Sequence, residues 1–232
     1  MVKNTVISVR KANNLFWLGR YEERVYVTLH ILRKCYDKMI DGQLEDYWPI
    51  WQKLDTAGRY QTREEFVLGM MYYRNNPASV ISAQVKAMDN AILLRENIKS
   101  ETLSYLEMSM ALLNECRDKQ EMNVICLQPV IDWSLAFWGS AEQRIQQHDV
   151  LFMMMVGRNL ENLDMLLRFD YPYDRIALAY ESLKRYCQQV GALLEAEAQS
   201  AIDHLIEPAR YNLRDIEYKN QLLRNINHLV RL

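Results

Sequence analysis

Apolar residues recur every three to four positions along most of the chain, the spacing that gathers side chains on one face of an α-helix. A first helix is predicted from Asn13 or Asn14, whose side chains can cap free backbone N–H groups, to about Met39. Its main apolar stripe, interrupted by Glu22, consists of Leu15, Leu18, Val25, Leu29, Leu32 and Tyr36. A second apolar face is formed by Phe16, Val27 and Ile31. Apolar surface on two sides predicts a helix that lies between others, near the middle of a bundle.

Start and stop signals predict the helices that follow. A shorter helix or loop is expected around residues 47–54, and residues 62–65 (Thr-Arg-Glu-Glu) read as a capping box opening a helix through about Tyr73. Asn75-Asn76-Pro77 should end that helix, and Ser79 should cap a long run whose pattern restarts around Ser100. Later helix starts are expected at Pro129, at His148 or Asp149, at Asp174 (a helix reaching about Leu205) and at Pro208.

No stretch of the sequence keeps the alternation of apolar and polar residues that a strand requires. Seven glycines and five prolines in 232 residues also favour long helices over a turn-rich β-fold. The sequence therefore predicts an all-α fold: a single-domain helical bundle of seven to nine helices, spanning residues 1–232, with two related central helices.

Net charge and apolar runs narrow the function classes. A formal charge of −2 argues against a nucleic-acid binder, which usually carries a basic stripe. No uncharged apolar run reaches about 18 residues, and residues 1–14 lack the apolar core of a secretory signal. We therefore expect a cytoplasmic protein that does not interact with membranes. The four cysteines form no C-x-x-C pair and are expected to be reduced thiols that pack as small hydrophobes.

A short polar signature occurs twice, 138 residues apart, inside apolar helical segments. Its first copy is Gly19, Arg20, Glu23 and Arg24; its second copy is Gly157, Arg158 and Glu161. Residues three apart share a helix face, so Arg20 can meet Glu23 and Arg158 can meet Glu161. Two interpretations remain open. The pairs are internal ion pairs, within a copy or crossed between copies, or the arginines bind a carboxylate or phosphate of a substrate through their planar donor sets.

Several catalytic and cofactor sites are not indicated. A di-iron bundle site needs Glu-x-x-His motifs, and the residues three before the histidines are Val27, Ile145, Ala201 and Asn225. The sequence also lacks a G-x-S-x-G elbow, a phosphate-binding loop and a dinucleotide fingerprint. We expect no metal and no cofactor, and whether the chain is an enzyme stays open.

Segments spread from residue 8 to about 170 resemble the bacterial alpha-E domain family, known for a Glu-Arg motif. The segment SVRKANNLFWLGRYEER resembles the family's opening, Asn76-Pro77-Ala78-Ser79 resembles its Asn-Pro-Ser-Ser segment, and Gly157-Arg158 with Glu161 resembles its second Gly-Arg-x-x-Glu-Arg copy. Arg95 and Glu96 resemble part of its central helix region. The chain departs from the pattern where Asn162 stands in place of the second motif's arginine.

The resemblance implies a function and partners. Members of the family accompany circularly permuted ATP-grasp proteins, often with a transglutaminase-like protease, and ATP-grasp enzymes activate a carboxylate and pass it to an amine. The chain is therefore expected to be a helical accessory protein in peptide ligation or modification, with a possible peptide substrate. The alternative is an enzyme that uses a buried Arg/Glu cluster for acid–base chemistry on an amide or ester. The candidate cluster is Arg20, Glu23, Arg24, Arg95, Glu96, Arg158 and Glu161.

Overall fold

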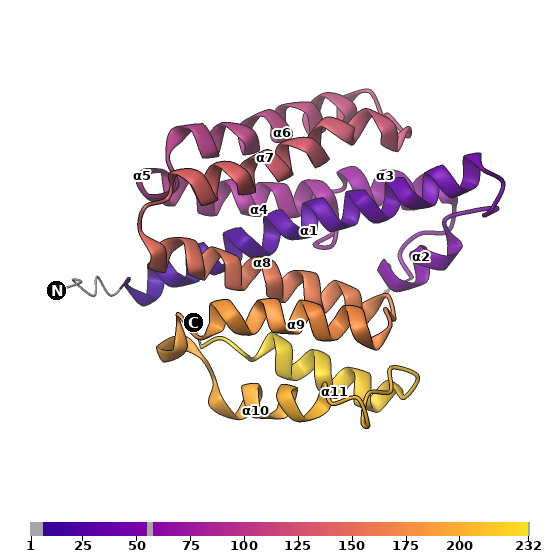
Figure 1. Cartoon of the computed structure of the whole chain (residues 1–232). Helices are drawn as coiled ribbons and strands as arrows, with labels where there is room; N and C mark the ends of the chain where they lie inside the picture. The colour runs from indigo at the N-terminus through magenta and orange to yellow at the C-terminus, as the bar shows by residue number, and fades with distance from the viewer. Residues whose placement is uncertain (1–6, 55–57, 232) are drawn as a thin grey trace. The chain divides into compact units, whose positions relative to one another are not determined.

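The computed structural model describes residues 7–54 and 58–231, in which eleven α-helices occur and no strand beyond one isolated bridge (Figure 1). The all-α prediction is confirmed, and nine of the eleven α-helices in the described residues have ten or more residues. The α-helices are α1 (Val9–Ile40), α2 (Trp48–Leu54), α3 (Arg63–Tyr72), α4 (Val80–Leu93), α5 (Arg95–Ile98), α6 (Ser100–Asp118), α7 (Gln128–Arg144), α8 (His148–Arg168), α9 (Tyr173–Cys187), α10 (Ala196–Leu205) and α11 (Ile216–Asn227). Two 3-10 helices are η1 (Val124–Leu127) and η2 (Gly191–Leu193).

The described chain divides into two compact units, which we call the terminal unit and the central unit. The terminal unit combines residues up to 20 with residues from 147 onwards, so that it is built from both ends of the sequence. The central unit spans residues 21–146. Helix α1 supplies residues to both units.

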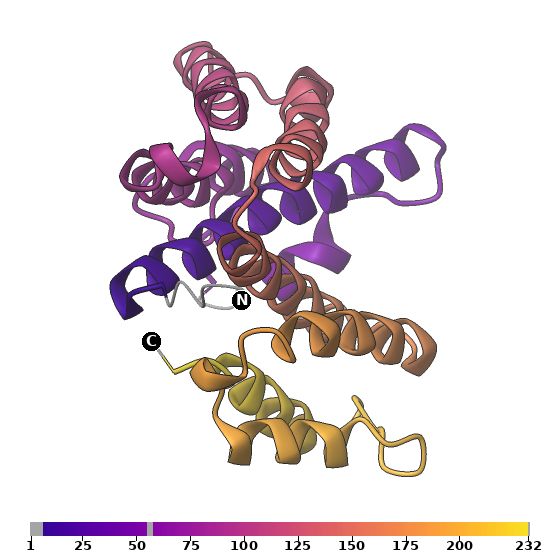
Figure 2. The ribbon, with the colours of Figure 1, turned by 60° about the vertical axis from the view of Figure 1, so that its left-hand side comes forward.

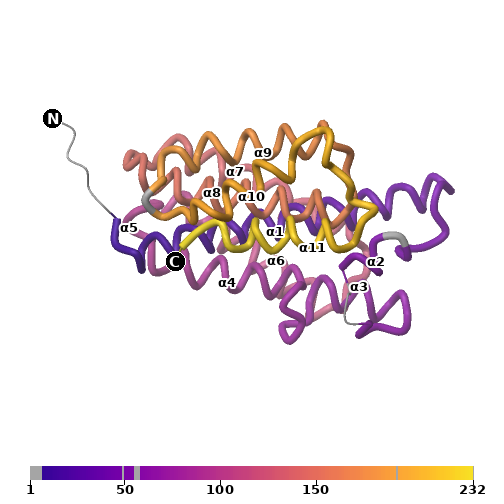
Figure 3. Tube along the Cα trace, turned by 90° about the horizontal axis from the view of Figure 1, so that it is seen from below, coloured from indigo at the N-terminus to yellow at the C-terminus, as the bar shows by residue number. Residues whose placement is uncertain are grey.

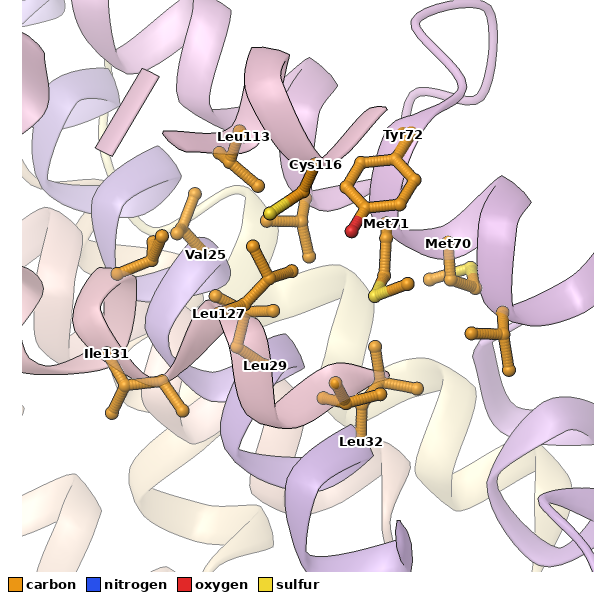
Figure 4. Close-up of a cluster of buried hydrophobic side chains, with 14 of the residues drawn as sticks. Val25, Leu29, Leu32, Met70, Met71, Tyr72, Leu113, Cys116, Leu127 and Ile131 are labelled. Carbon is orange, nitrogen blue, oxygen red and sulfur yellow. The ribbon is translucent and has the colours of Figure 1, made fainter. Parts of the chain in front are cut away.

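The core of the central unit collects the predicted stripe of α1. Val25, Leu29 and Leu32 are fully buried in a cluster that also takes residues from α3, α6 and η1 (Figure 4). The methionines Met70 and Met71 of α3 lie in this cluster, where their flexible side chains fill space between branched neighbours. Around it, α6 packs along α7 and α4, as Figure 1 shows. The apolar spacing of α1 thus predicted its buried face correctly.

Local capping decides several helix starts. Thr62 and Glu65 form the predicted capping box, with the Glu65 backbone N–H donating to Thr62 Oγ1 over 3.2 Å. Ser79 caps α4 as predicted, and its hydroxyl also donates to the Tyr73 carbonyl over 2.7 Å. The prediction for α1 was wrong: the helix begins at Val9, because Ser8 Oγ accepts the Lys11 backbone N–H (3.3 Å) before Asn13 is reached.

In the terminal unit, α8 packs along α9, and α10 pairs with α11 (Figures 1 and 2). Figure 3 shows α10 and α11 from below, where the chain changes direction between the two helices. An antiparallel bridge joins Leu194 to Val230 and fastens the last residues to the segment before α10.

Two predicted helix boundaries in this unit were wrong. The helix expected from Asp174 to about Leu205 is two helices, because the backbone between them pairs with the C-terminal segment instead of with its own turns: Glu195 N–H donates to Leu229 O over 2.9 Å. Asp174 lies in the first turn of α9 and does not cap it. The last helix begins at Ile216 and not near Pro208, because Asp215 accepts the backbone N–H groups of the first turn.

Within residues 7–54 and 58–231, no helix combines the length and the apolar character that crossing a membrane would require.

Candidate functional site

The two glycines of the repeated signature bring helix backbones into contact in the terminal unit. A Cβ added to Gly19 would lie 2.1 Å from the carbonyl oxygen of Met154, and one added to Gly157 would lie 2.1 Å from that of Phe16. Met154 precedes Gly157 by three residues, as Phe16 precedes Gly19, so the two contacts repeat each other. Only glycine fits at these positions, because no real Cβ approaches a carbonyl oxygen so closely. The repeat is therefore a crossing point of α1 and α8.

At this crossing, Arg20 of the first copy is paired with Glu161 of the second. Arg20 Nε donates to Glu161 Oε2 over 2.8 Å, and the side chains are 5% and 0% exposed. The Arg20 guanidinium carbon also lies 5.2 Å from the centroid of the Trp17 ring, a cation–π distance. Of the arrangements considered from the sequence, the crossed pairing between copies is the one found for Arg20 and Glu161.

The ion pair continues into a polar network that reaches α11. Arg20 Nη1 donates to Asn227 Oδ1 over 3.0 Å, and Asn227 Nδ2 donates to Asp164 Oδ1 over 3.1 Å. Asp164 is 1% exposed and also accepts hydrogen bonds from Arg168, one turn later on α8. Asn227 uses its amide oxygen on a cation and its amide nitrogen on an anion, so its orientation is fixed by both. The network thus links α1, α8 and α11.

Two ion pairs of this network are Arg20 with Glu161 and Arg168 with Asp164. Burial alone would raise the pKa of Asp164, but the hydrogen bond and charge of Arg168, together with the charge of Arg20, hold that pKa below its ordinary value. Asp164 therefore stays ionised and keeps its neighbours in place. Hydrogen-bonded ion pairs whose carboxylates are buried suit the fastening of helices better than proton transfer.

Beside the network, the terminal unit has a hollow of about 750 Å³ along α11 and the end of α8. Its lining is Arg168, Ile216, Glu217, Asn220, Leu223, Arg224, Asn227 and His228. Arg168 and Asn227 belong to the network and also line the hollow. Their hydrogen bonds to Asp164 and Arg20 therefore fix part of the lining of the hollow. Arg224 is exposed and makes no ion pair with any residue of the described ranges. The hollow can therefore offer a guanidinium to an acidic ligand next to apolar Ile216, which is 75% exposed.

The other residues of the predicted cluster have different settings. Glu23 is buried, whereas Arg24 and Arg158 are partly buried on α1 and α8. Arg95 and Glu96 are exposed on α5 and make no ion pair in the part of the chain that the structure describes. Arg95 and Glu96 therefore lie at the surface, whereas Arg20, Glu23 and Glu161 of the predicted cluster are buried. Across the described residues, no group of three or more His, Cys, Asp or Glu side chains is placed to hold a metal ion.

Asp164, Arg168 and Asn227 belong to the network but were not among the residues predicted from the sequence. The spacing of Asp164 and Arg168, four residues apart on a helix, was a usable signal for their pairing. Asn227 gave no such signal, because its two charged partners lie 63 and 207 residues away in the sequence.

A second buried acid, Glu22, lies in the central unit. Its side chain is 0% exposed, one oxygen accepts the Ser134 hydroxyl over 2.7 Å, and the other finds no hydrogen-bond partner among the described residues. Burial, with a smaller contribution from the charge of Glu23, raises the pKa of Glu22 to about 7. In the sequence, Glu22 was noticeable as an acidic residue that interrupts an apolar stripe.

Comparison with known proteins gives one family. The model of the Alpha-E family, described as a predicted alpha-helical domain with a conserved ER motif, matches residues 7–215. The Glu-Arg pair of the first signature copy, Glu23-Arg24, falls inside this match. The comparisons with curated proteins and with solved structures gave no match.

Proposed function

Because the chain belongs to the Alpha-E family, we propose that it is a helical accessory protein that works with a circularly permuted ATP-grasp amide ligase in peptide ligation or modification. In this proposal the ligase binds ATP and makes the acyl phosphate, and the Alpha-E chain binds a carboxylate-bearing peptide in the hollow along α11. A transglutaminase-like protease is a further partner in the same system.

The single observation that carries the proposal is that the terminal unit has a buried, paired arginine and an exposed arginine in the lining of the hollow. Arg20 is buried and donates hydrogen bonds to Glu161 and Asn227, so its charge is used within the protein. Arg224 lies on the open wall of the hollow without an ion-pair partner among the described residues. A fixed interior that supports an exposed cation next to apolar Ile216 and Leu223 is suited to binding an extended acidic segment.

Co-expression with a circularly permuted ATP-grasp protein, followed by size-exclusion chromatography and an assay of ADP release with a peptide acceptor, tests the proposal. We expect a stable complex and at least a roughly tenfold faster peptide-dependent reaction when the chain is present, since tenfold corresponds to about 1.4 kcal/mol of barrier. The absence of a complex, together with full ligase activity without this chain, would reject the proposal.

Reversing the charge of Arg224 tests whether the peptide binds in the hollow or elsewhere on the surface. Arg224→Glu should keep the fold and the complex but raise the KM for the peptide about tenfold or more, because the ligand carboxylate then meets a like charge. Arg185→Glu, at an exposed position of α9 outside the hollow, is the matched control and should leave the KM unchanged. Equal KM values for both variants would exclude the hollow as the peptide site.

A second candidate function is an enzyme that acts by itself on an amide or ester. It draws support from Glu22, since a carboxyl group with a pKa of about 7 is suited to general acid–base catalysis near neutral pH. Its side chain is fully buried, so substrate access would require the central unit to open. A folded Glu22→Gln variant with undiminished activity in the co-expressed system would eliminate this candidate.

A further inference from the structure

Two cysteines that are unremarkable in the sequence lie together in the central unit. The sulfur atoms of Cys116 and Cys126 are 3.5 Å apart, although ten positions separate the residues in the chain. Cys116 lies in the last part of α6 and is 5% exposed, whereas Cys126 lies in η1 and is partly exposed. The expectation that the cysteines pack as small hydrophobes therefore does not describe this pair fully.

The turn between the two cysteines is held by its own hydrogen bonds. Glu121 N–H donates to the Cys116 carbonyl over 2.9 Å, which folds the chain back against the end of α6. The Glu121 carboxylate accepts the Asn123 N–H over 2.8 Å, and Asn123 Oδ1 caps η1 through the Ile125 N–H at 2.9 Å. These contacts fix the start of η1 and so place Cys126 over Cys116. The proximity follows from the local sequence of this turn.

We propose that Cys116 and Cys126 are a site of reversible oxidation that forms an intramolecular disulfide on exposure to hydrogen peroxide. The sulfur atoms must approach by about 1.5 Å to reach the disulfide bond length of about 2.0 Å. Cys126 lies in η1 and is partly exposed, which gives peroxide access to this residue.

The reaction balances with peroxide as the only oxidant. The Cys126 thiolate attacks one peroxide oxygen, the O–O bond breaks, and the departing hydroxide takes up a proton, leaving a sulfenic acid on Cys126. The Cys116 sulfur, after loss of its proton, then attacks the Cys126 sulfur, so that an S–S bond forms, the S–O bond breaks and a second water leaves. Two thiols and one peroxide give one disulfide and two waters.

The surroundings make this reaction slow at neutral pH. Burial, together with the neighbouring Cys116 thiol and the Glu121 carboxylate, raises the pKa of Cys126 to about 12. The pKa of the adjacent Tyr72 hydroxyl is also raised by burial, so this group does not act as an acid near neutrality. Figure 4 shows Cys116 and Tyr72 within the same apolar cluster. Because the thiolate is the reacting form, the rate of disulfide formation should rise about tenfold per pH unit between pH 7 and pH 9.

The test treats the full-length chain with hydrogen peroxide and then measures free thiols, intact mass and the disulfide-linked peptides. We expect two of the four thiols to disappear, the mass to fall by two hydrogens, and a linked peptide containing Cys116 and Cys126, all reversed by dithiothreitol. The thermal unfolding midpoint of the oxidised chain should rise by about 5 °C, because the closed turn restricts the unfolded chain.

Matched variants distinguish this pair from the remaining thiols. Cys126→Ala changes the less buried partner and should remove the linked peptide and the rise in the midpoint, with the far-UV circular dichroism unchanged. Cys35→Ala, elsewhere in the same unit, should leave disulfide formation at the wild-type rate. The proposal is wrong if the folded chain keeps all four thiols, gains only oxygen, or links Cys126 to a cysteine other than Cys116.

Discussion

At the scale of single residues, Glu22 is the clearest case of a side chain whose chemistry its surroundings change. Its carboxyl group is fully buried with one hydrogen bond from Ser134, and its pKa is raised from the ordinary 4.5 to about 7. Between these two pH values the folded chain binds more protons than the unfolded chain. The contribution of Glu22 is therefore most favourable below about pH 4.5 and is lost as the pH rises to about 7.

Glu22→Gln should accordingly stabilise the chain at pH 8 by roughly 2–3 kcal/mol, since glutamine keeps an acceptor for Ser134 and carries no charge to bury. The difference from wild type should shrink towards pH 4.5. Urea unfolding at several pH values measures it. Glu107→Gln, exposed on α6, is the control and should follow the wild-type pH profile, and parallel profiles for all three proteins would contradict the assignment.

The sequence identified Glu22 as unusual but could not indicate its protonation. The interruption of an apolar stripe is a local signal, visible on one helix. The partner Ser134 lies 112 residues away, and the extent of burial depends on packing with other helices. A pKa is set by that three-dimensional environment, which the order of residues along one helix does not specify.

At the scale of elements, the glycines of the repeated signature determine how closely α1 and α8 approach. Each glycine lies against a carbonyl oxygen of the facing helix, at a distance that leaves no room for a methyl group. Close approach of helix backbones through small residues increases the van der Waals contact between them. The signature therefore combines a small residue for contact with a charged pair for register.

Gly19→Ala and Gly157→Ala should each destabilise the chain by about 3 kcal/mol, because the facing backbone must move to admit the methyl group. Gly139→Ala is the matched control: it is a helical glycine of α7 with open space around the new methyl group, and it should stabilise by about 0.5–1 kcal/mol through helix propensity. Thermal and urea unfolding measure all three. Equal effects at the three positions would contradict this packing role of Gly19 and Gly157.

The success of helix prediction depended on whether the deciding partner was local. Thr62 and Ser79 cap helices through amides three residues away, and both starts were predicted. The break between α9 and α10 was missed, because the amide of Glu195 pairs with Leu229, a residue 34 positions later. Long-range backbone pairing of this kind leaves little trace in the periodicity of apolar residues.

At the scale of the whole molecule, the sequence separates into two compact units, and the terminal one joins the start of the chain to its end. The family match, over residues 7–215, includes both signature copies, and the Glu-Arg pair itself is present only in the first. The sequence located both copies and allowed a crossed pairing between them. It could not decide between pairing within a copy and pairing across copies, because that choice depends on where the helices cross.

The central claim is that Arg20 and Glu161, separated by 141 residues, form an internal ion pair that holds the terminal unit together. Each single change leaves the other charge buried, so Arg20→Met and Glu161→Gln should each cost about 3–5 kcal/mol. Removing both charges should cost less than the sum of the single changes.

A double-mutant cycle of these two substitutions, measured by urea unfolding at pH 7, tests the claim most directly. We expect a coupling energy of at least about 2 kcal/mol between the two positions. Single effects that add to within about 0.5 kcal/mol would contradict it.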